Sequence, residues 1–525
     1  MKTVVFRGRI SARQTVGGMA AILALLLFTQ PCLAGGDDHR ALRLLLDKGI
    51  ITQQEYDQAV QEDEREEQRE KQATAITKHG LEFKLGGFAE IDFIEDNTRS
   101  FQETIGNRPV LRSNTLAGAN SQFLASPRNS RIRIDVQAPE RDGIKTRFHT
   151  SFDFLGNQPS VGTSGVSEFS AVTSPVARIF KMYLHVETPV VDVRIGQDWS
   201  KFGFMSEYAR GQVSVATTPA QLFNRWVQAS VSKRLLVTDT LSLTPVFSVE
   251  RPPQADASLP SFVAGVQIAH SGLQAPYTGS SMGEISLKPL SLQVSGVGRR
   301  LEANSGGPTN LSGGQPNLSG QTYVTGWGIS SSVFIPVLPS RDGSIGNTAH
   351  VVMEGVTGAG ISDMFLGLSW GVCNPVCGTA TNTGFGGAAF GQTNIDGGLA
   401  AVSSQTGKFE AIRTTSMMVH GTYYLPNDGK TWVGGGYGTI YSSNAAEMTC
   451  AGTGATATLQ ASSCGGAVRT PQSIYVRDST YYAYVFHDFT QEIRAALTTN
   501  FIRTTYADGA NAENHRIQMT FFYRF

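Results

Sequence analysis

The 525-residue chain carries 43 Lys and Arg against 43 Asp and Glu, so its formal net charge is zero. Nucleic-acid-binding domains are markedly basic, and this balance therefore argues against nucleic acid as a partner. One apolar run near the N-terminus is about 13 residues long, too short to cross a bilayer as a helix, and no longer run follows it.

The first 34 residues have the layout of a secretory signal peptide. Four basic residues, Lys2, Arg7, Arg9 and Arg13, precede the apolar run Val16 to Phe28, and small residues around Cys32-Leu33-Ala34 suit cleavage. The mature chain is then expected to start at Gly35. Lipidation of Cys32 is the alternative, but the preceding Thr29-Gln30-Pro31 lacks the aliphatic and small residues of a lipobox.

Residues 35–79 form the one stretch with helical spacing of apolar residues. Gly49 is placed like a helix C-cap, and Thr52 like an N-cap with Glu55 three residues later. A charged run from Glu62 to Lys71 follows. The segment is predicted to be a periplasmic α-helix, either solvated along its length or part of a short coiled coil that fixes the oligomeric state.

From Leu81 the apolar period changes to two. Leu81, Phe83, Leu85, Gly87, Ala89, Ile91 and Phe93 fall on one face, and Glu82, Lys84, Gly86, Glu90 and Asp92 fall on the other. Strands of soluble sheets are typically about five or six residues long. This longer run suits a tilted membrane strand of about 9–11 residues plus overhang.

The alternation returns four times before residue 200, separated alternately by short turns and long segments. The polar rows are Arg131, Arg133, Asp135 and Gln137; Lys145, Arg147, His149, Ser151 and Asp153; Lys181, Tyr183, His185 and Glu187; and Asp192 and Arg194. The opposite rows, including Phe180, Met182, Leu184 and Val186, are expected to face lipid. With eleven later candidates, residues 80–525 are predicted to form an all-β transmembrane antiparallel barrel of about sixteen strands. Eighteen is the alternative, because residues 358–408 could hide a hairpin.

The C-terminus has the pattern of a last barrel strand. Phe521, Tyr523 and Phe525 continue an apolar row that starts at Ile517, and they resemble the signal read by the barrel-assembly machinery. A closed sheet also satisfies every edge amide and carbonyl group, which lipid cannot do. The sequence therefore predicts an outer-membrane barrel.

The order of segments resembles the DcaP-like porins, which are trimeric barrels with an N-terminal periplasmic helical region. The resemblance rests on short stretches, namely 193–203, 260–266, 290–300 and Gly326-Trp327-Gly328-Ile329-Ser330. Residues 46–56 and Gly196-Gln197 look equally like phosphate-selective porins of the O/P type. The resemblance implies a trimer that passes small organic anions such as dicarboxylates; phosphate is the alternative solute.

In a porin, fixed charges in a water-filled lumen select ions. The polar rows make Arg131, Arg133, Lys145, Arg147, Lys181 and Arg194 candidate lining residues that favour anions. By resemblance, the third long loop narrows the pore, which adds Asp198, Lys201 and Arg210. The alternatives are that the basic residues only form ion pairs along the wall, and that Trp199 and Phe202 merely anchor the loop.

Catalysis has little support in the sequence. His149, Ser151 and Asp153 share one face, but neighbours two apart along a strand are separated by about 7 Å, beyond hydrogen-bond reach. No metal ligand set and no cofactor site are expected. A set of tyrosines and other aromatic residues is interpreted as girdles at the membrane interfaces: Tyr423, Tyr424, Trp432, Tyr437, Tyr441, Tyr481, Tyr482, Tyr484, Phe521 and Tyr523. A plugged structural or adhesin barrel stays open as an alternative to a channel.

Four cysteines remain after the signal peptide, and export favours their oxidation. Cys373–Cys377 and Cys450–Cys464 are the expected disulfides, each within a long loop. We predict that reduction and alkylation of the denatured native protein will label four more thiols than alkylation alone. Labelling of those thiols without reductant would contradict the assignment.

Overall fold

The computed structural model describes residues 75–78, 80–106, 109–156, 176–203, 219–252, 258–278, 285–302, 323–365, 399–402, 409–447 and 474–525. The predicted signal peptide and nearly all of the predicted helical segment lie outside these residues, as do Arg210 and the four loop cysteines. No helix in the described ranges is long and apolar enough to cross a membrane. The chain divides into two units, Met1–Leu85 and Gly86–Phe525.

In the first unit, the described residues form a small hairpin. Strand β1 (Ala75–Lys78) pairs antiparallel with the first residues of β2 (Leu81–Asp96), and Gly80 turns the chain with φ +79°. The helical prediction for 35–79 is therefore wrong at its last residues. Ile76 and Thr77 are β-branched and favour extended backbone, and a left-handed glycine permits the tight turn.

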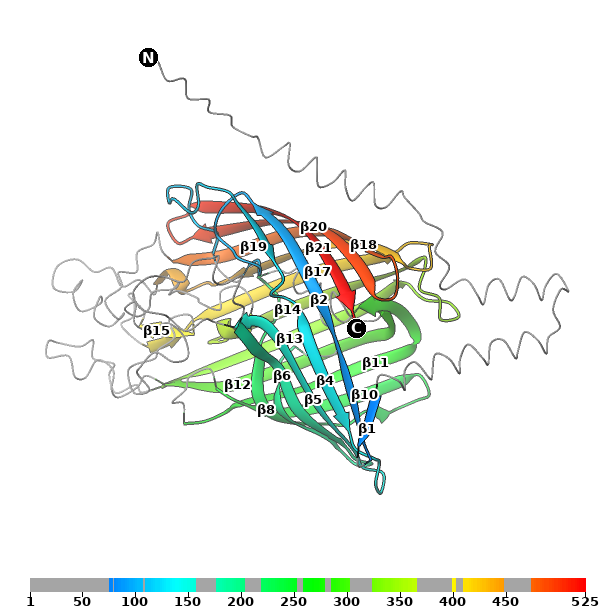
Figure 1. The fold of residues 1–525 in the computed structure, drawn as a ribbon. Helices are drawn as coiled ribbons and strands as arrows, with labels where there is room; N and C mark the ends of the chain where they lie inside the picture. The colour runs from blue at the N-terminus through cyan, green and yellow to red at the C-terminus, as the bar shows by residue number, and fades with distance from the viewer. Residues whose placement is uncertain are drawn as a thin grey trace, which may run out of the picture. The chain divides into compact units, whose positions relative to one another are not determined.

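The second unit is a closed antiparallel β-barrel (Figure 1). After β2 its strands are β3 (Gln122–Ser126), β4 (Arg131–Gln137), β5 (Lys145–Gly156), β6 (Val176–Glu187), β7 (Asp192–Trp199), β8 (Arg225–Ser232), β9 (Leu235–Leu236), β10 (Leu241–Glu250), β11 (Ser261–Thr278), β12 (Ile285–Glu302), β13 (Tyr323–Leu338), β14 (Thr348–Ala359), β17 (Arg413–Tyr424), β18 (Thr431–Tyr441), β19 (Tyr475–Asp488), β20 (Ile493–Tyr506) and β21 (Asn511–Arg524). The described sheet has 19 strands; β1 is set apart, and β3–β4 and β8–β9 each act as one interrupted strand. Sixteen barrel strands result, as the sequence predicts.

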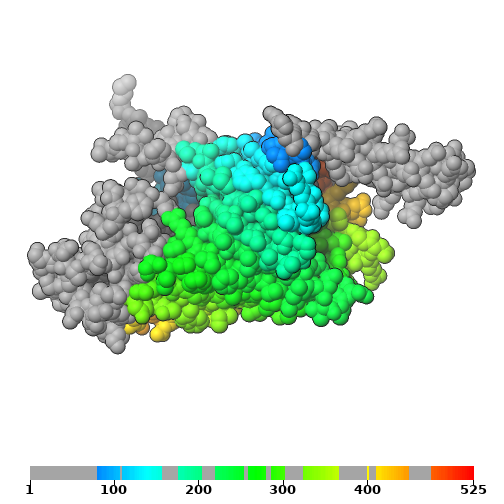
Figure 2. Space-filling view, turned by 90° about the horizontal axis from the view of Figure 1, so that it is seen from below, coloured from blue at the N-terminus to red at the C-terminus, as the bar shows by residue number. Residues whose placement is uncertain are grey.

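Closure joins the first and last barrel strands. β2 pairs with β21 from Phe88↔Arg524 to Asp96↔Arg516, so the sheet has no free edge at this junction. The closed outer wall over the strands coloured cyan to green is visible in Figure 2. Long loops leave one end of the barrel and short turns the other, and these are named the long-loop end and the short-turn end below.

Side chains alternate between the two faces of the sheet as predicted. Outward residues are apolar and exposed, for example Ile91, Ile195, Val227, Ile329 and Met417. Inward residues are largely polar, among them Asp92, Ser230, Gln293, Ser332, Thr480, Asn500 and Gln518. Successive side chains of a strand point to opposite faces, and a barrel in lipid turns its apolar face outward.

Three turns at the short-turn end share an Asp-Gly pair in the left-handed region. Asp142-Gly143, Asp342-Gly343 and Asp428-Gly429 have φ values of +53° and +75°, +53° and +78°, and +58° and +72°. This conformation matches the right-handed twist of the flanking strands. The Glu140-Arg141-Asp142-Gly143 turn expected from the sequence is present between β4 and β5.

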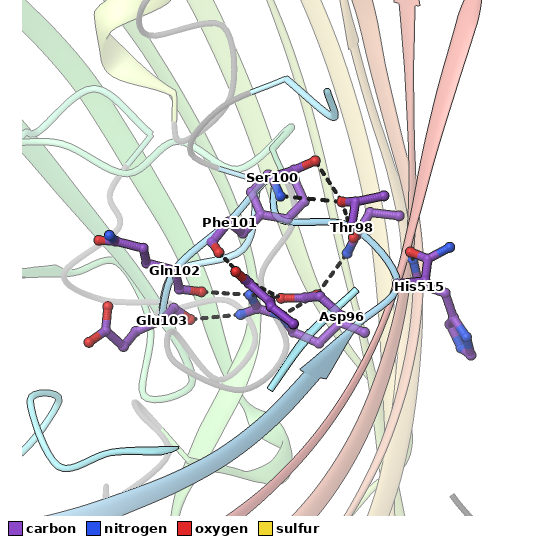
Figure 3. Close-up of polar contacts among 11 residues, drawn as sticks. Asp96, Thr98, Ser100, Phe101, Gln102, Glu103 and His515 are labelled. Atoms are coloured by element: carbon purple, nitrogen blue, oxygen red, sulfur yellow. Dashed lines mark hydrogen bonds and ion pairs between the residues drawn. The ribbon is translucent and has the colours of Figure 1, made fainter. Parts of the chain in front are cut away.

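The loop after β2, residues 97–121, is fastened to the inner wall. Arg516 of β21 donates from Nη2 to Asp96 Oδ2 at 2.7 Å and from Nη1 to the carbonyl oxygen of Glu103 at 2.8 Å. Asp96, Gln102 and Glu103 lie at this contact in Figure 3, and Thr98 and Ser100 lie beside it. Further along the loop, Val110 N–H donates to Thr504 Oγ1 at 2.8 Å. The loop therefore folds into the barrel.

A second clasp holds the same loop from the long-loop end. Arg112 Nη2 donates to Asp508 Oδ1 at 2.6 Å, and this hydrogen bond holds the pKa of Asp508 below its ordinary value. Asp508 lies in the tight turn between β20 and β21.

Loss of the inner clasp should destabilise the barrel. Both side chains of the Arg516–Asp96 pair are fully buried, and removing one partner of such a pair costs about 3–5 kcal/mol. We expect Arg516→Met to lower the unfolding free energy in detergent by this amount, measured by urea titration. The matched control, Arg503→Met, breaks the exposed Arg503–Glu513 pair on the outer face and should cost at most about 1 kcal/mol. Equal effects would contradict the assignment.

Candidate functional site

Basic side chains gather inside the barrel along β4 to β8. Most stand at inward positions, whereas Arg225 begins β8 with the parity of the exposed Val227 and has its guanidinium against Phe180. This set, the cationic wall, comprises Arg131, Arg133, Lys145, Arg147, Arg178, Lys181, Arg194 and Arg225. The side chain of Arg133 is 58% exposed and that of Lys145 is 56% exposed. Arg147 is also exposed, whereas Thr498 and Thr520 on the inward faces of β20 and β21 are buried. Water can therefore reach these basic side chains of the cationic wall, whereas the inward Thr498 of β20 and Thr520 of β21 are covered.

A β-bulge in the cationic wall turns the side chain of Phe180 to the inner face of the barrel. The β5–β6 register shifts between Ser151 and Phe152, leaving Phe180 without a partner across the strand. Phe180 is buried, and the guanidinium carbons of Arg131 and Arg225 lie 3.4 and 3.8 Å from its ring centroid. The prediction that Phe180 faces lipid is therefore wrong, because an inserted residue breaks the period of two.

Two buried aspartates neutralise part of the cationic wall. Asp198 lies 3.1 Å from Lys181 Nζ and 2.6 Å from Arg194 Nη1. Asp153 receives a bidentate pair from Arg178, with Nη2 to Oδ2 at 2.6 Å. The ion-pair interpretation thus applies to Lys181 and Arg194. It also applies to Arg133, 3.1 Å from Asp135 Oδ2, and to Lys145, 3.8 Å from Glu140 Oε2. Asp198 lies at the end of β7 as a partner of these two cations.

Arg131 and Arg225 are not neutralised in this way. Neither forms an ion pair with any described residue, and Nε of Arg131 and Nη1 of Arg225 are buried without a hydrogen-bond partner. Two guanidinium groups cannot share one ring face at the observed distances, so they lie on opposite faces of Phe180. A buried charge without a partner is costly and strongly attracts an anion.

The rest of the bore at the long-loop end is filled by three loops. Phe101 and Ile105 of loop 97–121, Phe202 and Leu222 of loop 200–224, and Phe365 of loop 360–412 belong to one buried apolar cluster. Inward residues of seven strands complete it: Val263, Val297, Val356, Ile440, Tyr475, Ile502 and Ala512. Loop 360–412 includes η2 (Ser362–Met364), β15 (Ala400–Val402) and β16 (Phe409–Ala411), and η3 (Ala445–Glu447) follows β18.

Loop 200–224, the third long loop, crosses from β7 to the far wall. Glu250 of β10 accepts hydrogen bonds from Ser200 Oγ and the backbone N–H of Lys201, each at 2.8 Å. Gly203 N–H donates to Ser295 Oγ of β12, also at 2.8 Å. The described parts of the loop therefore reach β10 and β12, and Phe202 packs in the apolar cluster. That this loop narrows the pore stays a prediction.

Several aromatic residues lie inside the barrel. Tyr424, Trp432, Tyr482 and Tyr484 are buried on the inward face, where they pack with Phe486 and Phe522. Their interpretation as lipid-facing girdles is wrong. Glycines provide the space: a Cβ at Gly434 or Gly436 would lie 2.3 or 2.7 Å from the hydroxyl oxygen of Tyr484 or Tyr482. The inward rings form a packed layer, whereas Tyr481 and Tyr523 remain outward and exposed.

Sequence reasoning missed Arg178, Arg225 and Phe180. Arg178 stands two residues before Phe180, and only the bulge brings both onto the wall with Lys181. Arg225 begins a predicted strand, but its parity is that of the outward Val227, so alternation alone places it outside the barrel. The structure places the other candidates on the wall, except Lys201, which lies in the loop, and Arg210, which lies outside the described residues.

The described part of the chain shows no catalytic or metal-binding arrangement. His149 Nδ1 lies 2.8 Å from Asp135 Oδ1 and stacks on Tyr183. Asp153 is engaged by Arg178. No group of three or more His, Cys, Asp or Glu residues suited to a metal ion occurs among the described residues.

No protein-family model and no curated protein matches the sequence. Solved structures match the fold. The outer membrane channel DcaP of Acinetobacter baumannii has a TM-score of 0.55 at 15% identity, with coverage of 86% of this chain and 99% of that chain. OmpT of Vibrio cholerae lacking loop L8 has a TM-score of 0.44 at 11% identity, covering 85% and 100%. An anion-selective porin from Comamonas acidovorans has 0.42 at 9%, covering 85% and 100%. The chain and the DcaP channel thus share a porin fold.

The anchors of loop 200–224 generate a test. Hydrogen bonds to a charged group contribute about 1.5–3 kcal/mol each, so Glu250→Ala should release the loop from β10. We expect a larger and noisier single-channel current in planar bilayers. Glu513→Ala, on the outer face, is the matched control and should leave the current unchanged. A native current from Glu250→Ala would show that the loop does not set the pore width.

Proposed function

We propose that this protein is an outer-membrane porin that passes small hydrophilic solutes by diffusion and favours small organic anions such as dicarboxylates. The observation that carries the proposal is the pair of partly buried guanidinium groups on either side of Phe180, neither of which forms an ion pair with a described residue. Such a pair attracts a solute carboxylate at close range. Charge-assisted hydrogen bonds from arginine to carboxylate are among the strongest in proteins.

The geometry supports an off-centre path for water and solute. Loops and aromatic rings fill the bore against β11 to β21, whereas Arg133, Lys145 and Arg147 on β4 and β5 are exposed. A solute that follows the cationic wall passes fixed positive charges on neighbouring strands. Focusing of the field between low-dielectric walls then raises the local anion concentration.

The barrel fold and the sequence also support the rest of the proposal. The apolar outer face suits lipid, with the short-turn end and the N-terminal segment in the periplasm. Phe521, Tyr523 and Phe525, at alternate positions of the last strand, are proposed as the barrel-assembly signal. A homotrimer is proposed from the resemblance to DcaP-like porins.

Two alternatives have specific support. A phosphate-selective porin would use the same guanidinium pair, because phosphate also accepts bidentate hydrogen bonds. A plugged structural barrel would explain the buried loop cluster at the long-loop end. Steady conductance of the folded protein distinguishes a channel from a plugged barrel.

The double variant Arg131→Gln/Arg225→Gln tests the anion preference. We expect the reversal potential under a KCl gradient to shift toward cation preference, because two fixed positive charges leave the wall. Stability should be unchanged or higher, since neither charge has a partner. Succinate or phosphate should raise the melting temperature of the native protein and not that of the variant.

Arg341→Gln/Lys430→Gln is the charge-matched control. These two residues lie in turns at the short-turn end, away from the bulge. Unchanged selectivity of Arg131→Gln/Arg225→Gln, or an equal shift from the control, would refute the assignment. A larger stabilisation by phosphate than by succinate would favour the phosphate alternative.

A further inference from the structure

Arg131 stands opposite a carboxylate that it does not bind. The β4–β5 register places it directly across from Asp153, and the Cβ atoms of such cross-strand neighbours lie about 4.5–5.5 Å apart, where opposite charges usually pair. The side chain of Arg131 instead lies on the ring of Phe180, with its guanidinium carbon 3.4 Å from the ring centroid. Arg131 forms no ion pair with any residue that the structure describes, and its Nε has no hydrogen-bond partner.

Asp153 is bound by another arginine. Arg178 is its partner across β5 and β6 and donates to it from Nε at 2.9 Å and from Nη2 at 2.6 Å. The side chain of Asp153 is only 1% exposed. Each carboxylate oxygen thus accepts a charge-assisted hydrogen bond from the same guanidinium, an arrangement that is strong and geometrically specific. Asp153 is therefore occupied, and Arg131 remains available to another anion.

Arg225 lies on the other face of the same ring. Its guanidinium carbon is 3.8 Å from the centroid of Phe180 and 4.8 Å from that of Trp199, and the two rings meet at 86°. The nearby Asp198 is bound by two other cations of the wall. Nη1 of Arg225 is buried without a hydrogen-bond partner. With one guanidinium carbon at 3.4 Å and the other at 3.8 Å from the ring centroid, the two are at most about 7 Å apart.

The ring of Phe180 determines where the donors of these two groups point. At 3.4 and 3.8 Å the guanidinium carbons are in van der Waals contact with the ring, which leaves no room for an N–H group directed at it. Each planar guanidinium must therefore lie flat on the ring. Its N–H donors then point along the ring plane and past the ring edge, in the fork geometry that matches a carboxylate.

We propose that Phe180 is a positioning residue for an oxyanion site: its ring holds Arg131 and Arg225 away from the carboxylates of the wall and leaves their paired donors to a solute carboxylate. The inference deepens the proposed function and rests on it. A chloride ion requires only positive charge, whereas a carboxylate gains from two coplanar donors. An uncharged residue thus selects between anions and leaves the net charge of the cationic wall unchanged.

The test compares Phe180→Leu with the native full-length protein. Leucine is apolar but has no flat face, so both guanidinium groups can turn toward Asp153, which acts electrostatically on each of them. Titration calorimetry in a non-ionic detergent, with succinate as the probe, should give a Kd about tenfold higher, which corresponds to the loss of about one charge-assisted hydrogen bond. The reversal potential under a KCl gradient should keep its native value, because no charge is removed.

Two further variants separate positioning from packing. Phe180→Tyr keeps both ring faces and should bind succinate like the native protein. Phe486→Leu removes a buried inward ring of β19 that packs against Trp432 and Phe522, and it should also bind like the native protein. Circular dichroism verifies that each variant is folded. If Phe180→Leu fails to fold, Phe180→Met replaces it, and the same weakening is expected.

Four outcomes overturn the inference. The first is native succinate affinity in Phe180→Leu, and the second is an equal loss in Phe486→Leu. The third is a shift of the reversal potential as large as that of Arg131→Gln/Arg225→Gln, which would mean that the ring acts on the fixed charge and not on the donors. The fourth is a native protein that binds phosphate but not succinate. Failure of the proposed function differs from all four: a native protein without conductance, or with cation preference, leaves the calorimetric comparison intact.

Discussion

Lipid offers no hydrogen-bond partner to the backbone, so a sheet that crosses a membrane must close on itself. The β2–β21 register satisfies this requirement, and the rest of the architecture depends on it. Closure fixes which alternate residues of each strand face outward. These residues are apolar because they face lipid. Every inward polar residue must then find water, a partner or a loop. Exposed, ion-paired and loop-bonded polar residues all occur on the described inner wall, and they divide it into regions.

The division of the inner wall supports the proposed path. Loop 97–121 uses the buried Arg516–Asp96 pair, loop 200–224 uses Glu250, and loop 360–412 uses Arg299, whose Nη1 donates to Asp363 at 2.7 Å. These contacts draw the loops toward β10 to β21. The strands from β4 to β8 keep exposed cations, and the Phe180 bulge adds two buried guanidinium groups there.

The fold could be predicted because period-two alternation and Asp-Gly turns are local signals. The sites inside the barrel could be predicted only in part. Arg131, Lys181 and Arg194 follow from parity, but Phe180 depends on a bulge that no local pattern marks, and Arg225 enters the barrel against the parity of its strand. Tyr482 and Tyr484 were misassigned because an aromatic strand residue suits either a membrane interface or a packed interior. Only the facing Gly434 and Gly436, on the next strand, decide between the two.

The central claim is that water follows the cationic wall while the opposite wall is dry. The most direct measurement is the single-channel current before and after a negatively charged methanethiosulfonate reagent is added. Arg147→Cys places the thiol on the exposed part of the cationic wall, and Thr498→Cys places it on the buried inner face of β20. The account predicts that the reagent reduces the current of Arg147→Cys and leaves those of Thr498→Cys and the native protein unchanged. Block at position 498 without block at position 147 would contradict it.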